Sequence, residues 1–276
     1  MRMRGAVPKA VVYAVLIVLS VAFLFPFVWM VSTALKPLDQ TMKQPPIWIP
    51  HPIRFSNFPD AVHAIPFFVY ARNTVFLCVM TVSGAVVSNA LVAYAFARLR
   101  WKGRDVLFWI TLATMMLPFP VLMVPLFGLF RHLNWIGTYR PLWLPAWMGN
   151  GFNIFLLRQF FRTIPWDLTE AATIDGAGQL RIFMDVVLPL CKPALAVVAL
   201  FTFMGTWNDF LGPLIYLVNQ KTFTLSLGLQ FYQSQHNGTD WNQLMAATTL
   251  VILPVIVLFF LTQKLFIKGI ALTGIK

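Results

Sequence analysis

Long uncharged, apolar intervals alternate with short clusters of charge along this chain of 276 residues. A helix of roughly 20 apolar residues is long enough to cross the hydrocarbon core of a bilayer. The apolar runs are continuous, whereas membrane β-strands alternate apolar and polar residues in pieces of about ten. The intervals lie at Ala10–Leu35, Asn73–Ala97, Val106–Phe130, Pro141–Leu157, from Pro193 to about Val218 with Asp209 as its one charge, and Trp241–Gln263.

These intervals predict an all-α integral membrane protein with six transmembrane helices in a single domain, residues 1–276. The fourth interval is short, so its flanking residues must reach for the interface or the bilayer must thin around it. We expect the spans at about 10–35, 73–97, 106–130, 141–161, 190–218 and 243–265.

Composition supports a membrane protein. The chain is 59% hydrophobic and 11% charged, while a soluble domain carries about 25% charged residues. The basic start Met1–Arg4 and the apolar run behind it look like a secretory signal. However, the apolar core of a signal spans about 7–15 residues, and Ala10–Leu35 holds 26. We therefore expect an uncleaved first helix.

The net charge of +12 is informative by position. With six spans and a cytoplasmic N-terminus, fourteen Lys and Arg residues fall inside and seven outside, as the positive-inside rule requires. The dense basic cluster Ala97–Arg104 is the strongest anchor of this orientation. Both termini are then cytoplasmic, and a nucleic-acid partner is not needed to explain the charge.

The predicted outer segments differ in character. Residues 36–71 contain seven prolines, which favour an extended loop because proline lacks a backbone donor. Apolar residues alternate with small polar ones from Phe223 to Leu229, a two-residue period. This stretch is either a loop edge packed on the helices or a surface for an external partner.

A mixed-polarity element interrupts the apolar chain at Glu170–Leu190. Asp167 or Thr169 can cap a helix start, with Glu170 placed as in a capping box. Gly176 can end that helix in a left-handed conformation, and a second helical stretch follows. The prediction is a short helix–turn–helix at the cytoplasmic face, serving either as a docking surface or as an interfacial connector between two spans.

The same stretch resembles the EAA loop of ABC importer permeases. The match covers Glu170, Ala171, Ala172, Gly176, Val186, Leu188 and Pro189. With residues 152–178, 201–217 and 268–276, the chain resembles in outline the second permease subunit of the maltose-type, carbohydrate importers. The resemblance implies a type I ABC importer permease fold in a prokaryotic cytoplasmic (inner) membrane, with a coupling loop at 166–188.

In that family two permeases pair, each docks its EAA element into one of two cytoplasmic ATPases, and an external binding protein delivers the sugar. The resemblance therefore assigns ATPase coupling to Glu170, Ala171, Ala172, Asp175 and Gly176. It also implies a C-terminal tail reaching between the ATPases, although this chain ends at Lys276 without the family's frequent terminal glycine.

Motifs for catalysis are missing from the sequence. It has no G-x-x-x-x-G-K-[ST] phosphate cradle and no H-E-x-x-H metal motif. Cys78 and Cys191 are far apart and suggest neither a disulfide framework nor a metal site. We expect a non-catalytic subunit that binds no cofactor, with ATP and Mg²⁺ on the partner ATPases.

Polar residues inside the spans are candidates for the transport pathway. Trp207, Asn208 and Asp209 lie well into the predicted fifth helix, where a carboxylate is costly unless it is paired or hydrated. They either contact sugar hydroxyls or satisfy a broken helix without touching a ligand. Asn153 is a further candidate, although polar residues in spans usually bond between helices.

Prolines make the third span a candidate gate. Pro118, Pro120 and Pro125 lie close together within it, and such a density kinks or breaks a membrane helix. Broken helices often lie at the pathway of a transporter.

Three functions remain open at this point. The resemblance favours an importer permease for a sugar or oligosaccharide, with glycerol phosphate or a polyol as the alternative cargo. A stand-alone secondary transporter should show two related halves, and the sequence has no internal repeat. A membrane scaffold has no need of a helix–turn–helix of this composition.

Overall fold

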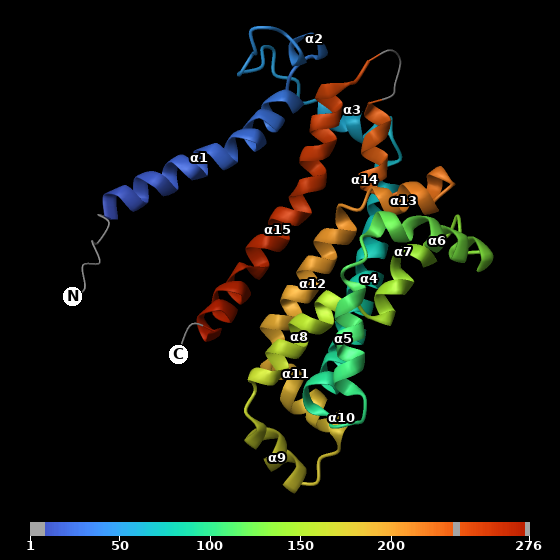
Figure 1. The fold of residues 1–276 in the computed structure, drawn as a ribbon. Coiled ribbons are helices and arrows are strands. Elements are labelled where there is room, and N and C mark those ends of the chain that lie inside the picture. Colours follow the sequence, from blue (N-terminus) through green and yellow to red (C-terminus); the bar gives the residue numbers. More distant parts are fainter. Residues whose placement is uncertain (1–8, 234–237, 274–276) are drawn as a thin grey trace. The chain divides into compact units, whose positions relative to one another are not determined.

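The computed structural model describes the backbone of residues 9–233 and 238–273, and within these ranges it contains helices and no strand (Figure 1). The predicted all-α architecture is confirmed. The basic residues Arg2, Arg4 and Lys276, and the end of the C-terminal tail, lie outside the described residues. The α-helices are α1 Lys9–Ala34, α2 Leu38–Thr41, α3 Asn57–Ala64, α4 Phe67–Arg98, α5 Arg104–Thr114, α6 Phe119–His132, α7 Arg140–Trp143, α8 Gly151–Thr163, α9 Trp166–Ile174, α10 Gln179–Ile182, α11 Leu188–Leu190, α12 Lys192–Trp207, α13 Leu211–Tyr216, α14 Leu225–Gly228 and α15 Trp241–Thr273.

Short helical turns of other types connect several of these helices. They are the 3₁₀ helices η1 Leu144–Met148, η3 Gln220–Thr222 and η4 Leu229–Tyr232, and the π-helix η2 Phe183–Val187. The chain divides into two compact units, one of residues 1–67 and 229–254 and one of residues 68–228 and 255–276.

The first unit combines an apolar helix with a polar, hydrogen-bonded cap. Helix α1 is a single helix of 26 residues, as predicted for the first span, and its most apolar window is not buried within the protein, as expected of a lipid-facing helix. Beyond its end, the Asn57 amide donates to the carbonyls of Ala34 and Lys36, at 2.8 Å each. Asn242 of α15 donates to Asn57 Oδ1 at 3.1 Å. These bonds fix the proline-rich segment.

The second unit contains the helices that form the candidate site. Helix α4 is an unbroken helix of 32 residues that passes every criterion for a membrane span. Helices α5 and α6 together match the third predicted span, but the chain bends by 100° between them. The bend follows from Pro118 at the N-cap of α6 and Pro120 in its first turn, since proline cannot continue the preceding helix.

The fourth and fifth predicted spans are also interrupted. In place of one helix over 141–161, the chain forms α7, η1 and α8, because Pro141 and Pro145 shorten the first segments and Gly149 turns with φ +92°. Helix α12 ends at Trp207, before the predicted span ends near 218, and α13 begins at Leu211. Among the described residues, three helices are long and apolar enough to cross a membrane, or up to five if each bent pair counts as one span.

One apolar core joins the lower helices of the second unit, where α9 and α10 lie in Figure 1. Small alanines of α4 and α12 pack there beside large aromatic and branched side chains of α4, α8, α10 and η2. Its buried members are Ala90, Ala93, Tyr94, Ala97, Leu157, Phe161, Ile164, Ile182, Phe183, Val187, Cys191, Ala194 and Val198.

The alternating stretch after Phe223 is held against α4. The Asn73 amide donates to the carbonyls of Lys221 and Phe223 at 2.9 Å each, and Thr74 accepts from the Leu225 amide at 2.9 Å. The stretch forms helical turns and not an edge strand, and Leu225 is buried. These contacts favour the packed-loop interpretation.

Candidate functional site

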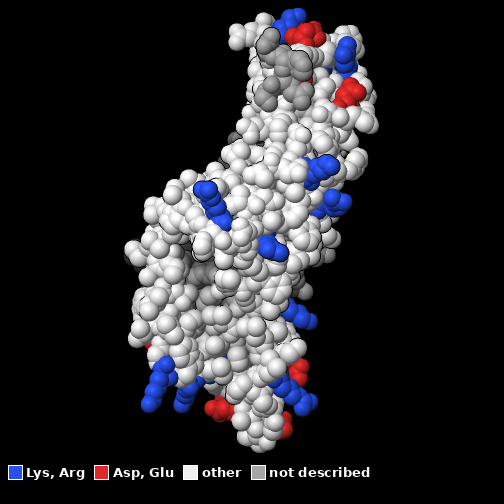
Figure 2. Space-filling view, turned by 90° about the vertical axis from the view of Figure 1, so that its right-hand side faces the viewer, with Lys and Arg blue, Asp and Glu red and all other residues white. Residues whose placement is uncertain are grey.

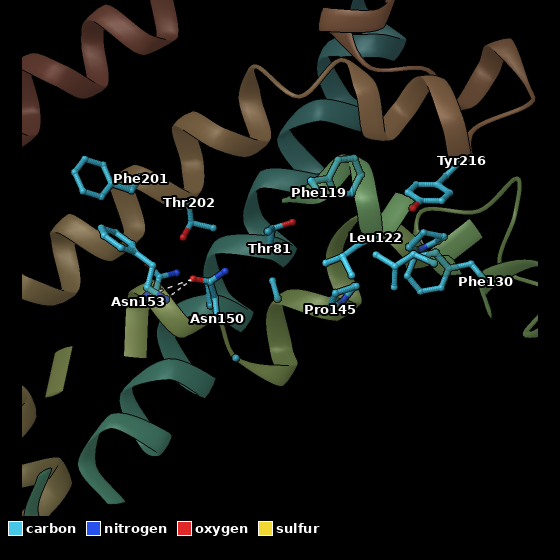
Figure 3. Close-up of a pocket in the computed structure, with 16 residues that line it drawn as sticks. Thr81, Phe119, Leu122, Phe130, Pro145, Asn150, Asn153, Phe201, Thr202 and Tyr216 are labelled. Carbon is cyan, nitrogen blue, oxygen red and sulfur yellow. Dashed lines mark hydrogen bonds between the residues drawn. The ribbon is translucent and has the colours of Figure 1, made fainter. Parts of the chain in front are cut away.

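A cavity of about 640 Å³ opens among α4, α6, η1, α8, α12 and α13 in the second unit (Figure 3). Its lining combines aromatic rings with neutral polar groups and contains no charged side chain among the described residues. The rings are Phe119, Phe130, Phe152, Phe201 and Tyr216, and the polar side chains are Thr81, Asn150, Asn153 and Thr202.

Two hydroxyl groups at this cavity have no hydrogen-bond partner. The Oγ1 of Thr81 and the phenolic oxygen of Tyr216 are buried and unbonded among the described residues, although both residues line the cavity. Buried polar groups are nearly always hydrogen-bonded in folded proteins. These hydroxyls are therefore unsatisfied polar groups of residues in the cavity wall.

The start of α8 is fixed at the cavity wall by two asparagines. Asn150 caps the helix, because its Oδ1 accepts from the amides of Phe152 and Asn153 at 3.0 and 3.3 Å. The backbone amide of Asn150 donates to Oδ1 of the fully buried Asn89 on α4, at 2.6 Å. Gly149 supplies the positive φ that turns the chain into this cap. The predicted pathway residue Asn153 thus lies at the cavity.

The three prolines predicted to shape a gate lie at the start of α6 or within it. Pro118 and Pro120 bend the chain at the start of α6, and Pro125 lies inside that helix. None of the three lines the cavity, but Phe119 and Leu122 of the same helix do. The prolines therefore shape the wall without forming it.

Trp207, Asn208 and Asp209 lie outside the cavity lining. The expectation that they lie well into a helix is wrong, because α12 ends at Trp207. The Asn208 amide donates to the Met204 carbonyl at 2.8 Å, and Asp209 Oδ1 accepts from the Gly212 amide at 3.0 Å. The two polar side chains therefore form hydrogen bonds with backbone groups on either side of the break between α12 and α13.

Helix α9 presents the EAA residues on its surface. Glu170 and Ala171 are exposed, whereas Ala172 packs against the apolar core of the second unit. The helix begins after Pro165 without a side-chain cap, so the predicted capping box is wrong. It ends as predicted, with Gly176 at φ +80°; Asp175 is the C-cap and is exposed.

An arginine that sequence reasoning used only to set orientation connects α4 to α9. Arg98 is 5% exposed, and its Nε and Nη2 donate to the Phe161 carbonyl at 3.0 and 2.7 Å. Nη2 also donates to the Ile164 carbonyl, and the guanidinium lies 4.6 Å from the ring centroid of Trp166. Arg98 therefore caps the end of α8 and stacks on the first residue of α9.

A metal site has no support in the part of the chain that the structure describes, since no group of three or more His, Cys, Asp and Glu side chains could hold an ion there. Cys78 and Cys191 are both free and buried.

Comparison with protein families decides the classification. Residues 85–272 match the family described as the binding-protein-dependent transport system inner membrane component. The chain belongs to this family. The matched range includes α9 and the helices around the cavity, apart from the first part of α4 with Thr81. The resemblance to ABC importer permeases noted from the sequence is confirmed.

Relatives of this family member are transport permeases. The chain is 34% identical to the sn-glycerol-3-phosphate transport system permease protein UgpE of Yersinia pestis, with 94% of each chain covered. It is 31% identical to the diacetylchitobiose uptake system permease protein DasC of Streptomyces coelicolor, again with 94% of each covered. It is 31% identical to the arabinooligosaccharides transport system permease protein AraQ of Halalkalibacterium halodurans, with 91% of each covered.

Solved structures show the same fold. A chain of a bacterial ABC transporter involved in the import of the acidic polysaccharide alginate superposes with a TM-score of 0.83 and 26% identity, covering 96% of this chain and 98% of that one. The type I ABC importer permease fold is thereby confirmed. The protein is a membrane-spanning permease of a binding-protein-dependent transporter, and its relatives are named as permease proteins of transport or uptake systems.

Proposed function

We propose that this permease forms half of the translocation pathway of an ATP-driven importer for a sugar or oligosaccharide. The other half comes from a second permease subunit, and an extracytoplasmic binding protein delivers the solute. The relatives named for diacetylchitobiose and arabinooligosaccharides support this cargo class.

The observation that carries the cargo class is the cavity. Its aromatic rings offer faces to the apolar side of a sugar ring, and its amides and hydroxyls offer hydrogen bonds, as in small-molecule sites generally. The unpartnered hydroxyls of Thr81 and Tyr216 are the groups most in need of a ligand. We assign Asn153 to the same wall.

Glycerol phosphate is the second candidate cargo, because the relative UgpE carries that name at 34% identity. A phosphate group is usually met by Arg or Lys side chains. The described lining of the cavity contains neither, so the neutral sugar is favoured.

We further propose that α9 couples this subunit to one of two partner ATPases. Glu170, Ala171, Asp175 and Gly176 are exposed and form the docking face, while Ala172 ties the helix to the core of its own subunit. A helix fixed in this way moves as a rigid body with the helices behind it. ATP and Mg²⁺ bind to the partners, and this chain holds no cofactor.

The orientation follows from the charge pattern. We propose a single permease domain with six spans in the bilayer, the fourth formed by α7, η1 and α8 together. The termini and α9 face the cytoplasm, and the basic cluster Ala97–Arg104 lies on the same side.

The cargo proposal is tested with variants that remove only a hydroxyl. We expect Thr81→Val and Tyr216→Phe, in the full importer in proteoliposomes, to raise the half-saturating concentration for oligosaccharide uptake by about fivefold each, since one hydrogen bond is worth about 1 kcal/mol. Thermal stability should be unchanged or higher, because each variant removes an unbonded buried group. Leu211→Ala, an exposed residue outside the lining, is the matched control. Unaltered uptake in both variants, or uptake of glycerol 3-phosphate alone, contradicts the sugar assignment.

The coupling proposal is tested by co-purification from native membranes. A tagged chain should bring down an ATPase and a second permease. Neither would appear with a stand-alone secondary transporter or a scaffold.

A further inference from the structure

A second, strongly basic cavity of about 360 Å³ lies where α4 and α8 end and α5 and α9 begin. The rings of Phe96 and Trp166 form part of its lining. Four arginines also line it: Arg100, Arg104, Arg158 and Arg162. In Figure 2, basic side chains lie at several heights on the face, including its lower end, where acidic side chains accompany them.

Two of the four guanidinium groups already interact with other residues of the protein through some of their atoms. Arg158 Nε donates to the Phe96 carbonyl at 3.3 Å, and its guanidinium stacks on the ring of Phe108. Arg104 pairs with Asp105 at 3.0 Å and donates to the Leu99 carbonyl at 3.3 Å. These bonds leave both Nη groups of Arg158 without a hydrogen bond to any described residue.

The other two guanidinium groups are not used by the fold at all. Within the described ranges, the side chains of Arg100 and Arg162 form no hydrogen bond and no ion pair. Each presents five donors in a planar fork, the geometry that matches a phosphate.

The charges around this cavity are not balanced. Asp105 is the one carboxylate paired with these arginines in the described structure, and it is exposed. The hydrogen bond from Arg104, and then the charges of Arg104, Arg158 and Arg162, hold the pKa of the Asp105 carboxyl below its usual value. Four like charges facing one exposed carboxylate favour the entry of a further anion.

The surroundings identify the source of that anion. A neighbouring cavity shares Arg100 and Arg104 and continues to Val106 at the start of α5. From there α5 exposes an apolar face, with Val106 64% and Trp109 70% exposed. A free phosphate ion gains no contact from an apolar face, whereas the acyl chains of a lipid pack against one.

We propose that this four-arginine cavity binds the phosphate of an anionic phospholipid, with the acyl chains lying along α5. Basic pockets between membrane helices on the cytoplasmic side recognise lipid headgroups in this way. The bound lipid contacts α4, α5 and α8 and the first residue of α9, Trp166, so it ties the base of the coupling helix to the bilayer. The lipid site itself does not depend on the cargo or on the ATPase proposal.

The test is lipid retention by the full importer complex, measured by native mass spectrometry after exchange into detergent with phosphatidylglycerol or phosphatidylcholine. We expect the wild type to retain phosphatidylglycerol at least about tenfold better than phosphatidylcholine, and salt to weaken it. The double variant Arg100→Gln/Arg162→Gln should lose this preference. It should still fold, because neither side chain bonds to the protein. Arg181→Gln, which removes an exposed arginine outside the cavity, is the matched control.

Three results overturn the proposal. One is an unchanged preference for phosphatidylglycerol in the double variant. Another is competition by inorganic phosphate without any lipid retention, which would make the ligand a soluble ion. The third is loss of the ATPase from the double variant with lipid retention intact, which would assign the arginines to a protein partner.

Discussion

Replacing Arg98 with alanine should disconnect the coupling helix from the membrane helices. In the structure its guanidinium reaches from the last turn of α4 to the carbonyls of Phe161 and Ile164 at the end of α8. It also stacks on Trp166, where α9 begins. The variant Arg98→Ala removes all of these contacts at once, and Arg98→Lys keeps the charge but cannot fork across two carbonyls.

The magnitude follows from what the variant leaves behind. Two carbonyls at a buried helix end lose their donor, at about 1–3 kcal/mol each. The lost cation–π contact with Trp166 adds about 0.5–2 kcal/mol. One term opposes these costs, because Arg98 Nη1 is buried without a partner and its removal relieves a penalty. Hydrogen bonds in membrane proteins also contribute less on average, about 0.6 kcal/mol each. We therefore expect Arg98→Ala to cost about 2–4 kcal/mol, and Arg98→Lys about half of that.

The assay compares ATP hydrolysis with solute uptake in the reconstituted importer. Arg98→Ala should lower the thermal denaturation midpoint and increase the number of ATP molecules hydrolysed per solute imported, since α9 no longer moves rigidly with α4 and α8. Arg181→Ala is the matched control, because that exposed arginine pairs only with Asp185 on the next turn, at 3.4 Å. Such a pair is worth about 0.3–0.5 kcal/mol. If Arg98→Ala leaves both stability and the hydrolysis ratio at wild-type values, the link from α4 to α9 does not carry the coupling.

Three further substitutions test other parts of the account. Gly84→Ala places a methyl group 2.2 Å from the Trp147 ring, and overpacking should cost about 1–3 kcal/mol; an unchanged melting curve would show that η1 is loosely packed. Asn89→Ala removes the acceptor of the Asn150 backbone amide and should lower the free energy of unfolding by about 1–3 kcal/mol. It should also weaken the affinity for the transported solute; normal affinity would show that this hydrogen bond does not support solute binding in the cavity. Ala171→Trp should abolish ATPase co-purification without loss of stability, because Ala171 is exposed; retained ATPase would exclude α9 as the docking face.

Features that depend on local sequence were predictable. Continuous apolar runs identified α1, α4 and α15 as spans, and the closely spaced prolines anticipated the break between α5 and α6. The left-handed turn at Gly176 followed from the absence of a Cβ. Each of these depends on a few neighbouring residues, so the sequence alone contained the information.

Features that depend on distant residues were not predictable. The bonds of Arg98 join residues 63 and 66 positions apart, and a count of basic residues per loop contains no such pairing. The break at Gly149 and Asn150 escaped the hydropathy pattern because both residues are uncharged. Asp209 looked costly inside a helix, but the chain leaves the helix before reaching it, and the carboxylate accepts from the Gly212 amide in the first turn of the next one.

Site-specific cross-linking from α9 tests the central claim most directly. The two native cysteines are buried, so a thiol introduced by Ala171→Cys is the reactive one, and Gln220→Cys, on the predicted outer side, is the control. In ATP-bound complexes, we expect a maleimide–benzophenone reagent attached to the thiol at position 171 to photo-cross-link to the ATPase subunit, and the same reagent at position 220 to form no such product. Cross-links from position 171 only within this chain, or to lipid-facing neighbours with the ATPase present, would contradict the claim that α9 is the coupling element.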